Sequence, residues 1–304
     1  MPISSSVQRY VAIKHGLGYK FADQEQMLWK YAAFADPFGD EYVSAARMIQ
    51  WAATASSVQR SREWLAVARS FAIAMHAEDD RHEIPPRDVF GKGKRPRPRP
   101  HIIAVTDIDR IMQAALSLPP IASLTPYTYH YLIGLLATTG LRVSEAVALL
   151  QTDLTVDGLL IRETKFHKIR LVPIDASTRK ALAEYLSLRQ RIGGPDPHLF
   201  VLSTGEAPDH ASVTRAFIKL ARQAGLRPAS GSGPRLHDLR HSFAVRSLEQ
   251  CGSDRAAINR HILALSTYLG HACLSDTYWY LEATPVLTRQ IAEAAEAFGK
   301  GGVQ

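Results

Sequence analysis

Residues 91–100 read GKGKRPRPRP, and this segment constrains the fold more than any other part of the chain. Proline stands at every second position from 96 to 100, where its fixed φ and missing amide hydrogen exclude a helix or a central strand. Such a stretch favours an extended, semi-rigid spacer. The chain has 304 residues, which is enough for a domain on each side. We therefore predict that residues 1–90 and 101–304 fold separately and that residues 91–100 link them.

The linker is also basic along its whole length. Its charged side chains are Lys92, Lys94, Arg95, Arg97 and Arg99, with no acidic residue among them. The whole chain carries a net charge of +7, which suits a polyanionic partner without proving one. A solvated spacer or a localisation signal would have the same composition. The functional hypothesis is a basic strap that lies along DNA phosphates.

Composition excludes several classes of protein. Apolar residues make up 46% of the chain, so it can bury a core and is not disordered throughout. Two cysteines, Cys251 and Cys273, are too few for a disulfide-stapled secreted scaffold. The N-terminal segment has no apolar core of the signal-peptide type, and no apolar run approaches the ~20 residues of a membrane-spanning helix. We expect a soluble, cytoplasmic protein that does not enter membranes.

Hydrophobic periodicity predicts the fold class. Before the linker, apolar stripes at helical spacing predict three or four short helices. The stripes are Leu28, Tyr31 and Phe34; Val43, Ala46, Ile49 and Ala53; and Val58, Leu65, Ala68, Phe71, Ala72 and Met75. After the linker, helices are predicted near 107–115, 127–138, 143–150, 177–191, 212–224, 238–250, 254–264, 275–283 and 286–298. Segments 155–161 and 169–174 alternate with a period of two and predict strands, with a hairpin turn at Asp157–Gly158. The fold class is mostly α with one small antiparallel β-sheet (α+β).

Two clusters of charged residues could carry chemistry, although each has an ordinary explanation when taken alone. Arg142 and Glu145 stand three residues apart at the start of a predicted helix, where they would form a common surface ion pair. Lys165 lies between two predicted strands, where a lysine usually serves solubility.

Two further clusters contain histidine and tyrosine. His237, Arg240 and His241 occupy positions i, i+3 and i+4 and so share one helix face. We predict no metal site here, because position 238 breaks the H-E-x-x-H pattern of zinc proteases and no third ligand is evident nearby. His271 precedes Tyr280, which would by itself be assigned to a hydrophobic core.

In their order along the chain, these clusters resemble the motifs of the tyrosine recombinases, also called phage integrases. The matching segments are 139–145 (TGLRVSE), Lys165 followed by 170–173 (RLVP), 237–241 (HDLRH), 269–271 (LGH) and Tyr280, nine residues after His271. The resemblance extends over about residues 101–285. It implies a tyrosine-recombinase-like catalytic domain at 101–304. Residues 1–90 match the family's helical core-binding (SAM-like) DNA-binding domain only in length and helical character.

The resemblance implies a role for each matched residue. Tyr280 would attack a DNA phosphodiester, form a 3′-phosphotyrosine bond and release a 5′-hydroxyl. Arg142 and Arg240 would neutralise the charge that develops on the phosphate, and their planar forks suit that task. His271 would donate a hydrogen bond to the same phosphate.

Proton transfer and support fall to the remaining matched residues. His237 is the candidate base for Tyr280, and Lys165 is the candidate acid for the leaving oxygen. Glu145 and His241 would support these groups without reacting. The covalent intermediate conserves the energy of the cleaved bond, so we expect no cofactor, no ATP and no metal.

The implied partners are double-stranded DNA with an inverted-repeat recombination site and further copies of this chain in a tetrameric synapse. The expected function is site-specific recombination or integration for a mobile element or plasmid. A type IB topoisomerase, which nicks and reseals one strand, would use the same chemistry. A catalytically silent architectural protein would keep the fold but lose a catalytic residue, and none is lost. A metal-dependent nuclease would need clustered carboxylates, whereas Asp and Glu are scattered here.

Overall fold

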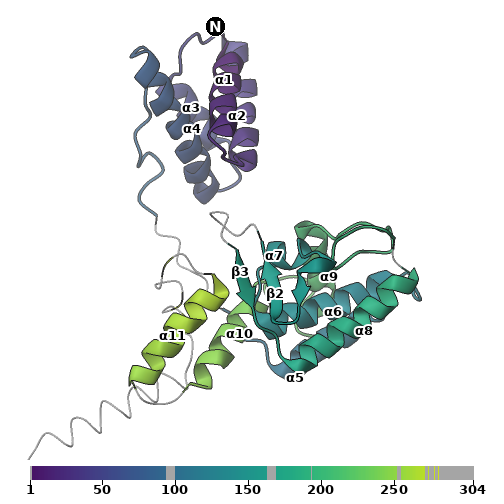
Figure 1. The fold of residues 1–304 in the computed structure, drawn as a ribbon. Helices are drawn as coiled ribbons and strands as arrows, with labels where there is room; N and C mark the ends of the chain where they lie inside the picture. The colour runs from purple at the N-terminus through teal and green to yellow at the C-terminus, as the bar shows by residue number, and fades with distance from the viewer. Residues whose placement is uncertain are drawn as a thin grey trace, which may run out of the picture. The chain divides into compact units, whose positions relative to one another are not determined.

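The computed structural model describes residues 2–93, 100–162, 169–192, 194–251 and 255–270, together with Cys273, Thr277 and Tyr280. Several predicted features lie outside these residues: Lys165, His271, the linker residues Lys94, Arg95, Arg97 and Arg99, the helix at 286–298 and most of the helix at 275–283. The chain divides into two compact units, Met1–Arg97 (unit 1) and Pro98–Gln304 (unit 2), each with its own core (Figure 1). Among the described residues, no helix combines the length and apolar character needed to cross a membrane.

Unit 1 is helical. Its elements are α1 (Ile3–Gly16), α2 (Ala22–Ala35), the short 3-10 helix η1 (Asp36–Phe38), α3 (Ala45–Ala53) and α4 (Val58–Glu78). Serine side chains begin two of the helices: Ser44 accepts a hydrogen bond from the amide of Arg47, and Ser57 accepts one from the amide of Arg60. These bonds satisfy amides that have no partner inside the helix and so fix where α3 and α4 begin.

The core of unit 1 confirms one predicted stripe and corrects another. Helix α4 buries Leu65, Ala68, Phe71, Ala72 and Met75 as predicted, whereas Val58 at its start is exposed. The stripe predicted around α3 is right for Val43, which is buried, and for Ile49, which packs against the core. It is wrong for Ala46 and Ala53, which are exposed, because the helix buries Met48, Trp51 and Ala52 instead. Trp51 stacks on Trp64 of α4 with ring centroids 4.8 Å apart. This large aromatic contact decides which face of α3 turns inward.

Two arginines of α4 hold the segment that leads to the linker. Arg62 donates from Nε and Nη2 to the carbonyl oxygen of Phe90 at 3.0 and 2.8 Å. Arg69 donates from Nε to the carbonyl oxygen of Pro85 at 3.0 Å. Both arginines are half-buried. They therefore fasten the chain backbone to α4.

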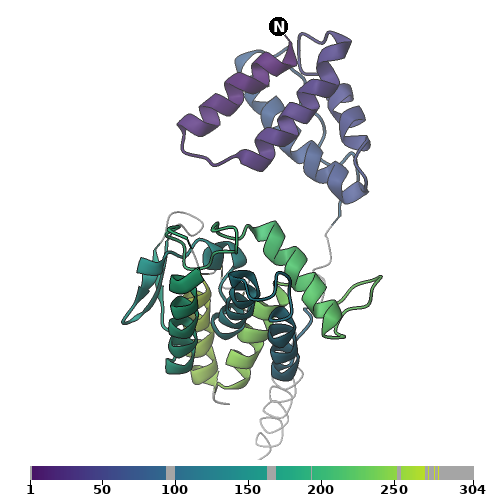
Figure 2. The same cartoon turned by 90° about the vertical axis from the view of Figure 1, so that its right-hand side faces the viewer.

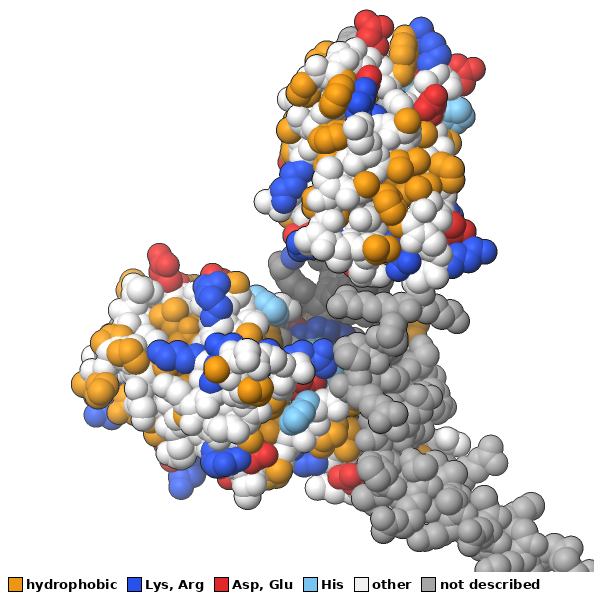
Figure 3. Space-filling model, turned by 180° about the vertical axis from the view of Figure 1, so that it is seen from behind, with side chains coloured by type: hydrophobic (Ala, Val, Ile, Leu, Met, Phe, Trp, Pro, Cys, Tyr) orange, Lys and Arg blue, Asp and Glu red, His pale blue; other side chains and the backbone are white. Residues whose placement is uncertain are grey.

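Unit 2 is mostly helical and contains a three-stranded antiparallel sheet, as predicted. Its helices are α5 (Val105–Ala115), α6 (Leu124–Thr139), α7 (Val143–Val147), α8 (Ala176–Ile192), α9 (His210–Gln223), α10 (Asp238–Glu249) and α11 (Arg255–Leu269). The sheet follows the 3-10 helix η2 (Gln151–Asp153) and has the order β1 (Leu154–Thr155), β2 (Gly158–Ile161), β3 (Arg170–Val172). Figure 2 shows the sheet at one edge of the unit, beside the helices. Figure 3 shows a band of Lys and Arg side chains across one face of unit 2.

The hairpin of the sheet turns one residue earlier than predicted. Thr155 pairs with Gly158, so the turn consists of Val156 and Asp157. Gly158 has a φ of +144°, and a Cβ at this position would lie 2.3 Å from the carbonyl oxygen of Val172. The close approach of β3 therefore requires glycine inside the strand.

Helix α6 lies at the centre of unit 2, where it packs against α5, α8 and α10. It is apolar nearly all round, as a helix buried on most sides must be. A smaller cluster joins α10 to α11 and consists of Ala244, Val245, Leu248, Ile262, Leu265, Leu269 and Tyr280. Helix α11 was predicted to end near 264, but it continues to Leu269 and stops before Gly270, whose φ is +66°. This extension brings the end of α11 to the site described next.

Candidate active site

Arg142 is fixed by the turn between α6 and α7. Helix α6 ends at Thr139 and is followed by Gly140, whose φ is +61° and whose Cβ, if present, would lie 2.5 Å from the ring of Phe243. Two residues later Arg142 directly precedes α7. Its amide donates to Oε2 of Glu145 at 2.9 Å, and its Nη1 donates to Oε1 at 2.8 Å. The Arg142 side chain stays 34% exposed, so it is held in direction while remaining accessible.

Arg240 lies in the first turn of α10 and is almost completely buried. Its Nη1 donates to the carbonyl oxygen of Gly140 at 2.7 Å, and its Nη2 donates to that of Leu269 at 2.8 Å. Burial, followed by the positive charge of Arg142, lowers the pKa of Arg240 to about 10. Arg240 therefore keeps its charge at neutral pH in an environment that disfavours it.

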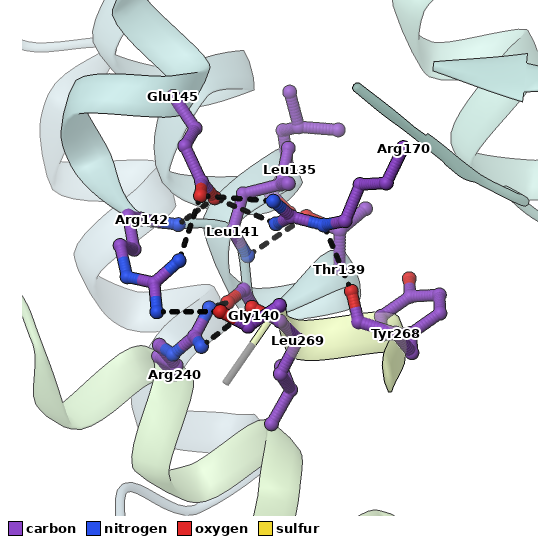
Figure 4. Close-up of polar contacts among 11 residues, drawn as sticks. Leu135, Thr139, Gly140, Leu141, Arg142, Glu145, Arg170, Arg240, Tyr268 and Leu269 are labelled. Carbon is purple, nitrogen blue, oxygen red and sulfur yellow. Dashed lines mark hydrogen bonds and ion pairs between the residues drawn. The ribbon is translucent and has the colours of Figure 1, made fainter. Parts of the chain in front are cut away.

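The carboxyl end of α11 binds arginines from three different elements (Figure 4). The hydrogen bonds run from Arg170 Nε to Tyr268 O (3.0 Å), from Arg240 Nη2 to Leu269 O (2.8 Å) and from Arg142 Nη2 to Gly270 O (3.0 Å). The last carbonyls of a helix lack intrahelical partners and carry partial negative charge, so they attract cations. Consecutive carbonyls thus hold side chains of β3, α10 and the start of α7 in one cluster.

Glu145 is the carboxylate inside this cluster, and its side chain is 6% exposed. Arg170 approaches it with both ends of its fork, Nη1 to Oε1 at 3.0 Å and Nη2 to Oε2 at 2.8 Å. Burial acts to raise the pKa of Glu145, but the hydrogen bonds from Arg170 and Arg142 outweigh it and the pKa is lowered. Among the described residues, Glu145 therefore binds two of the three guanidinium groups of this cluster, while Arg240 binds backbone carbonyls, and the cluster has a surplus of positive charge suited to an anion.

Two neighbouring histidines at the start of α10 lead to Tyr280. Nδ1 of His241 lies 3.2 Å from the hydroxyl oxygen of Tyr280. The ring of His237, which is exposed at the start of α10, meets His241 edge-on with centroids 4.5 Å apart. Burial, followed by the charge of His237, lowers the pKa of His241 to about 4. His241 is therefore neutral at pH 7, and in the tautomer with its proton on Nε2 it accepts a hydrogen bond from Tyr280.

The sequence prediction assigned the proton transfer to His237, whereas the ring in hydrogen-bond contact with Tyr280 is that of His241. Burial and the charge of Arg240 lower the pKa of His237 as well. Tyr280 itself is 3% exposed and packs in the cluster between α10 and α11.

The structure brings together Arg142, Glu145, Arg240, His237, His241 and Tyr280 within one part of unit 2, while Lys165 and His271 lie outside the described residues. Sequence reasoning missed Arg170 as a member of this cluster, because it stood only as part of the RLVP segment. Of the predicted linker contacts, Lys92 is described. Its side chain is 87% exposed and lies 3.9 Å from Asp88. No group of three metal-binding side chains occurs in the described part of the chain.

Comparison with known proteins gives matches over nearly the whole chain. A sequence profile of the phage integrase family matches residues 102–285. The candidate integrase/recombinase y4rB of Sinorhizobium fredii is 38% identical over 303 residues, which cover 96% of each chain. Tyrosine recombinase XerD of Brucella suis is 31% identical over 226 residues, or 71% of this chain and 69% of XerD. A lambda integrase tetramer bound to a Holliday junction has the same fold, with a TM-score of 0.66 at 16% identity over 91% of this chain and 77% of that chain.

Proposed function

This chain belongs to the phage integrase family and is a tyrosine-type site-specific DNA recombinase; from that premise we propose that Tyr280 forms the covalent bond to DNA and that Arg142 and Arg240 bind the scissile phosphate. The observation that carries this assignment is the convergence of both arginines on the end of α11, beside the α10 histidines that lead to Tyr280. Arginines that served only as isolated surface charges would not be expected to bind neighbouring carbonyls at one helix end.

The arginines supply the electrostatic part of the reaction. The non-bridging oxygens of the phosphate gain negative charge in the transition state, and guanidinium groups that are already in place stabilise that charge. Each guanidinium has five N–H donors, more than its hydrogen bonds to Glu145 and to the backbone carbonyls use. Arg142 and Arg240 therefore have donors left for a phosphate, and their orientation is set before DNA binds.

Tyr280 supplies the nucleophile. Its hydroxyl oxygen attacks phosphorus, the new O–P bond forms, and the bond from phosphorus to the 5′-oxygen breaks. The phenol proton passes to the histidine pair on α10, in which the neutral His241 already contacts the hydroxyl and His237 follows. By family resemblance, Lys165 protonates the leaving oxygen and His271 binds the phosphate. Attack by a different 5′-hydroxyl reverses these steps and joins the strands in a new combination.

DNA binding involves both units and the linker in this proposal. Residues 1–90 act as the helical DNA-binding domain and residues 101–304 as the catalytic domain. The linker residues Lys92, Lys94, Arg95, Arg97 and Arg99 contact phosphates. The net charge of +7 and the basic band across unit 2 (Figure 3) support a polyanionic partner. The lambda integrase structure contains a tetramer on a Holliday junction, and this supports a tetrameric synapse of this chain on DNA. We propose that the DNA site consists of inverted repeats and that the reaction serves a mobile element or plasmid.

The decisive experiment follows covalent adduct formation on a nicked duplex that carries the inverted repeats flanking the gene. Wild-type protein should form an adduct that survives denaturing electrophoresis, with or without excess EDTA. Tyr280→Phe should bind the same DNA with near-normal affinity and form no adduct. Tyr268→Phe, a matched change on a half-buried tyrosine, should still form it. An adduct with Tyr280→Phe would move the nucleophile to another residue, and complete dependence on Mg²⁺ would overturn the metal-free mechanism.

A further inference from the structure

We propose that Arg170 is a positioning residue of the recombination reaction: it acts through Glu145 on Arg142 and does not itself bind the phosphate. This inference rests on the function proposed above. It gives a role to a side chain of β3 that the motif comparison left without one.

All three nitrogens of the Arg170 guanidinium donate to groups of the protein. Nη1 and Nη2 bind the two oxygens of Glu145, and Nε binds the carbonyl oxygen of Tyr268. The side chain is 14% exposed, compared with 34% for Arg142. Arg142 is therefore the more exposed of the two arginines that bind Glu145, whereas all three nitrogens of Arg170 already donate to groups of the protein.

Gly270 provides a second, independent observation. Its φ of +66° favours glycine, and a Cβ on it would lie 2.9 Å from Nη1 of Arg170 and 3.1 Å from Cζ. The guanidinium of Arg170 thus fills the space that a side chain at 270 would take. The carbonyl of the same glycine accepts the hydrogen bond from Arg142. The backbone at 270 therefore touches both arginines.

Loss of Arg170 would change Glu145 before it changed anything else. The carboxylate is buried, and Arg170 donates a hydrogen bond to each of its two oxygens. Without Arg170, the buried charge of Glu145 would have too few hydrogen-bond donors. Glu145 would then either take up a proton or draw Arg142 toward itself. In both cases the fork of Arg142 would turn from the direction that the intact cluster sets. Arg170 thereby determines how well Arg142 meets the transition state, with little effect on DNA binding.

A matched control is available in the same sheet region. Arg179 of α8 also donates from both Nη atoms to backbone carbonyls, those of Thr155 at 2.7 Å and Val156 at 2.8 Å. These acceptors belong to the β1–β2 hairpin and lie outside the arginine cluster. Arg179→Gln therefore removes comparable hydrogen bonds without touching Glu145.

The test compares single-turnover cleavage of a normal DNA site with cleavage of the same site carrying a methylphosphonate at the scissile position. A methylphosphonate lacks the negative charge that Arg142 neutralises. Arg170→Gln should cleave normal DNA about 100-fold more slowly than wild type, with an unchanged Kd for DNA. On the methylphosphonate site the defect should fall below about 10-fold, as it should for Arg142→Gln. Arg170→Lys should be intermediate, and Arg179→Gln should match wild type on both substrates.

Each alternative outcome points to a different failure. Equal defects on the two substrates would mean that Arg170 only stabilises the fold, and cleavage at the wild-type rate would mean that it has no role; either result overturns the inference. Failure of the wild-type protein to form any adduct would instead overturn the proposed function. If Arg170→Gln does not fold, Gly270→Ala displaces the same guanidinium and should show the same difference between substrates; equal defects there would overturn the inference too.

Discussion

Arginine side chains bind backbone carbonyls in both units, but the two settings differ. In unit 1, Arg62 and Arg69 occupy separate positions on α4, and each donates hydrogen bonds to a different backbone carbonyl of the segment before the linker. In unit 2, Arg142, Arg170 and Arg240 converge on three consecutive carbonyls at the end of α11. Two of them, Arg142 and Arg170, also bind the buried carboxylate of Glu145.

We interpret the arginines of unit 1 as structural and the arginine cluster of unit 2 as functional, because the two differ in burial and in how close the charges lie to one another. Single, half-buried arginines bind carbonyls without opposing one another. A buried cluster disfavours its own charges, and the lowered pKa of Arg240, caused by burial and by Arg142, shows this directly. Packing alone does not require three guanidinium groups at one helix end. In the function that we propose, the charge of a bound phosphate balances their positive charge.

The largest effect expected from this comparison concerns catalysis. Arg142→Lys and Arg240→Lys should each slow adduct formation by about 100-fold or more, since an ammonium keeps the charge but not the planar fork. Arg62→Lys and Arg69→Lys should stay within about twofold of wild type. Single-turnover adduct formation measures the rate of cleavage, and gel mobility shifts measure DNA binding. Near-normal cleavage by both Arg142→Lys and Arg240→Lys would remove the distinction between the units.

A second test compares two glycines that end helices. Gly140→Ala should destabilise unit 2 by about 3 kcal/mol, because the position has a positive φ and the new Cβ would strike Phe243. Gly39 ends η1 in unit 1 with a φ of +72° and nothing within 4 Å of a Cβ, so Gly39→Ala should lower the free energy of unfolding by about 1 kcal/mol. Denaturant unfolding gives both values. Equal losses would show that backbone strain alone matters at Gly140.

A third test concerns a pH dependence of stability from buried histidines. The folded pKa of His241 is about 4 against an ordinary 6.5, so the unfolded state takes up the proton first as the pH falls. The contribution of His241 is present above pH 6.5 and is lost progressively toward pH 4. Between pH 7.5 and 5 this loss amounts to about 2 kcal/mol.

The measurement is the difference in unfolding free energy between these two pH values. In His241→Gln the difference should shrink by about 2 kcal/mol. His82 of unit 1 accepts a hydrogen bond from the amide of Val43, and burial lowers its pKa, so His82→Gln should change the pH dependence with the same sign. An unaltered pH dependence in His241→Gln would show that this ring is not held neutral.

Some parts of the fold could not be predicted because long-range contacts decide them. Apolar periodicity predicted the buried stripe of α4, but for α3 it selected Ala46 and Ala53, which are exposed. The stacking of Trp51 on Trp64 determines which face of α3 is buried. The apolar pattern of one helix does not show which helix will pack against it. Helix α11 likewise continues past its predicted end, because its last carbonyls find arginine partners distant in sequence.

The sequence by itself determined the division at the linker, the mixture of helices with a small sheet, and the residue types and order of the recombinase motifs. These features depend on local backbone preferences and on side-chain chemistry, both of which follow directly from the residue types in each segment. Tertiary structure alone decided that Arg170 joins Glu145 and that His241 contacts Tyr280. Arg170 and Glu145 are 25 residues apart, and His241 and Tyr280 are 39 apart. Only the packing of β3 and the helices within unit 2 fixes which side chains meet across such distances.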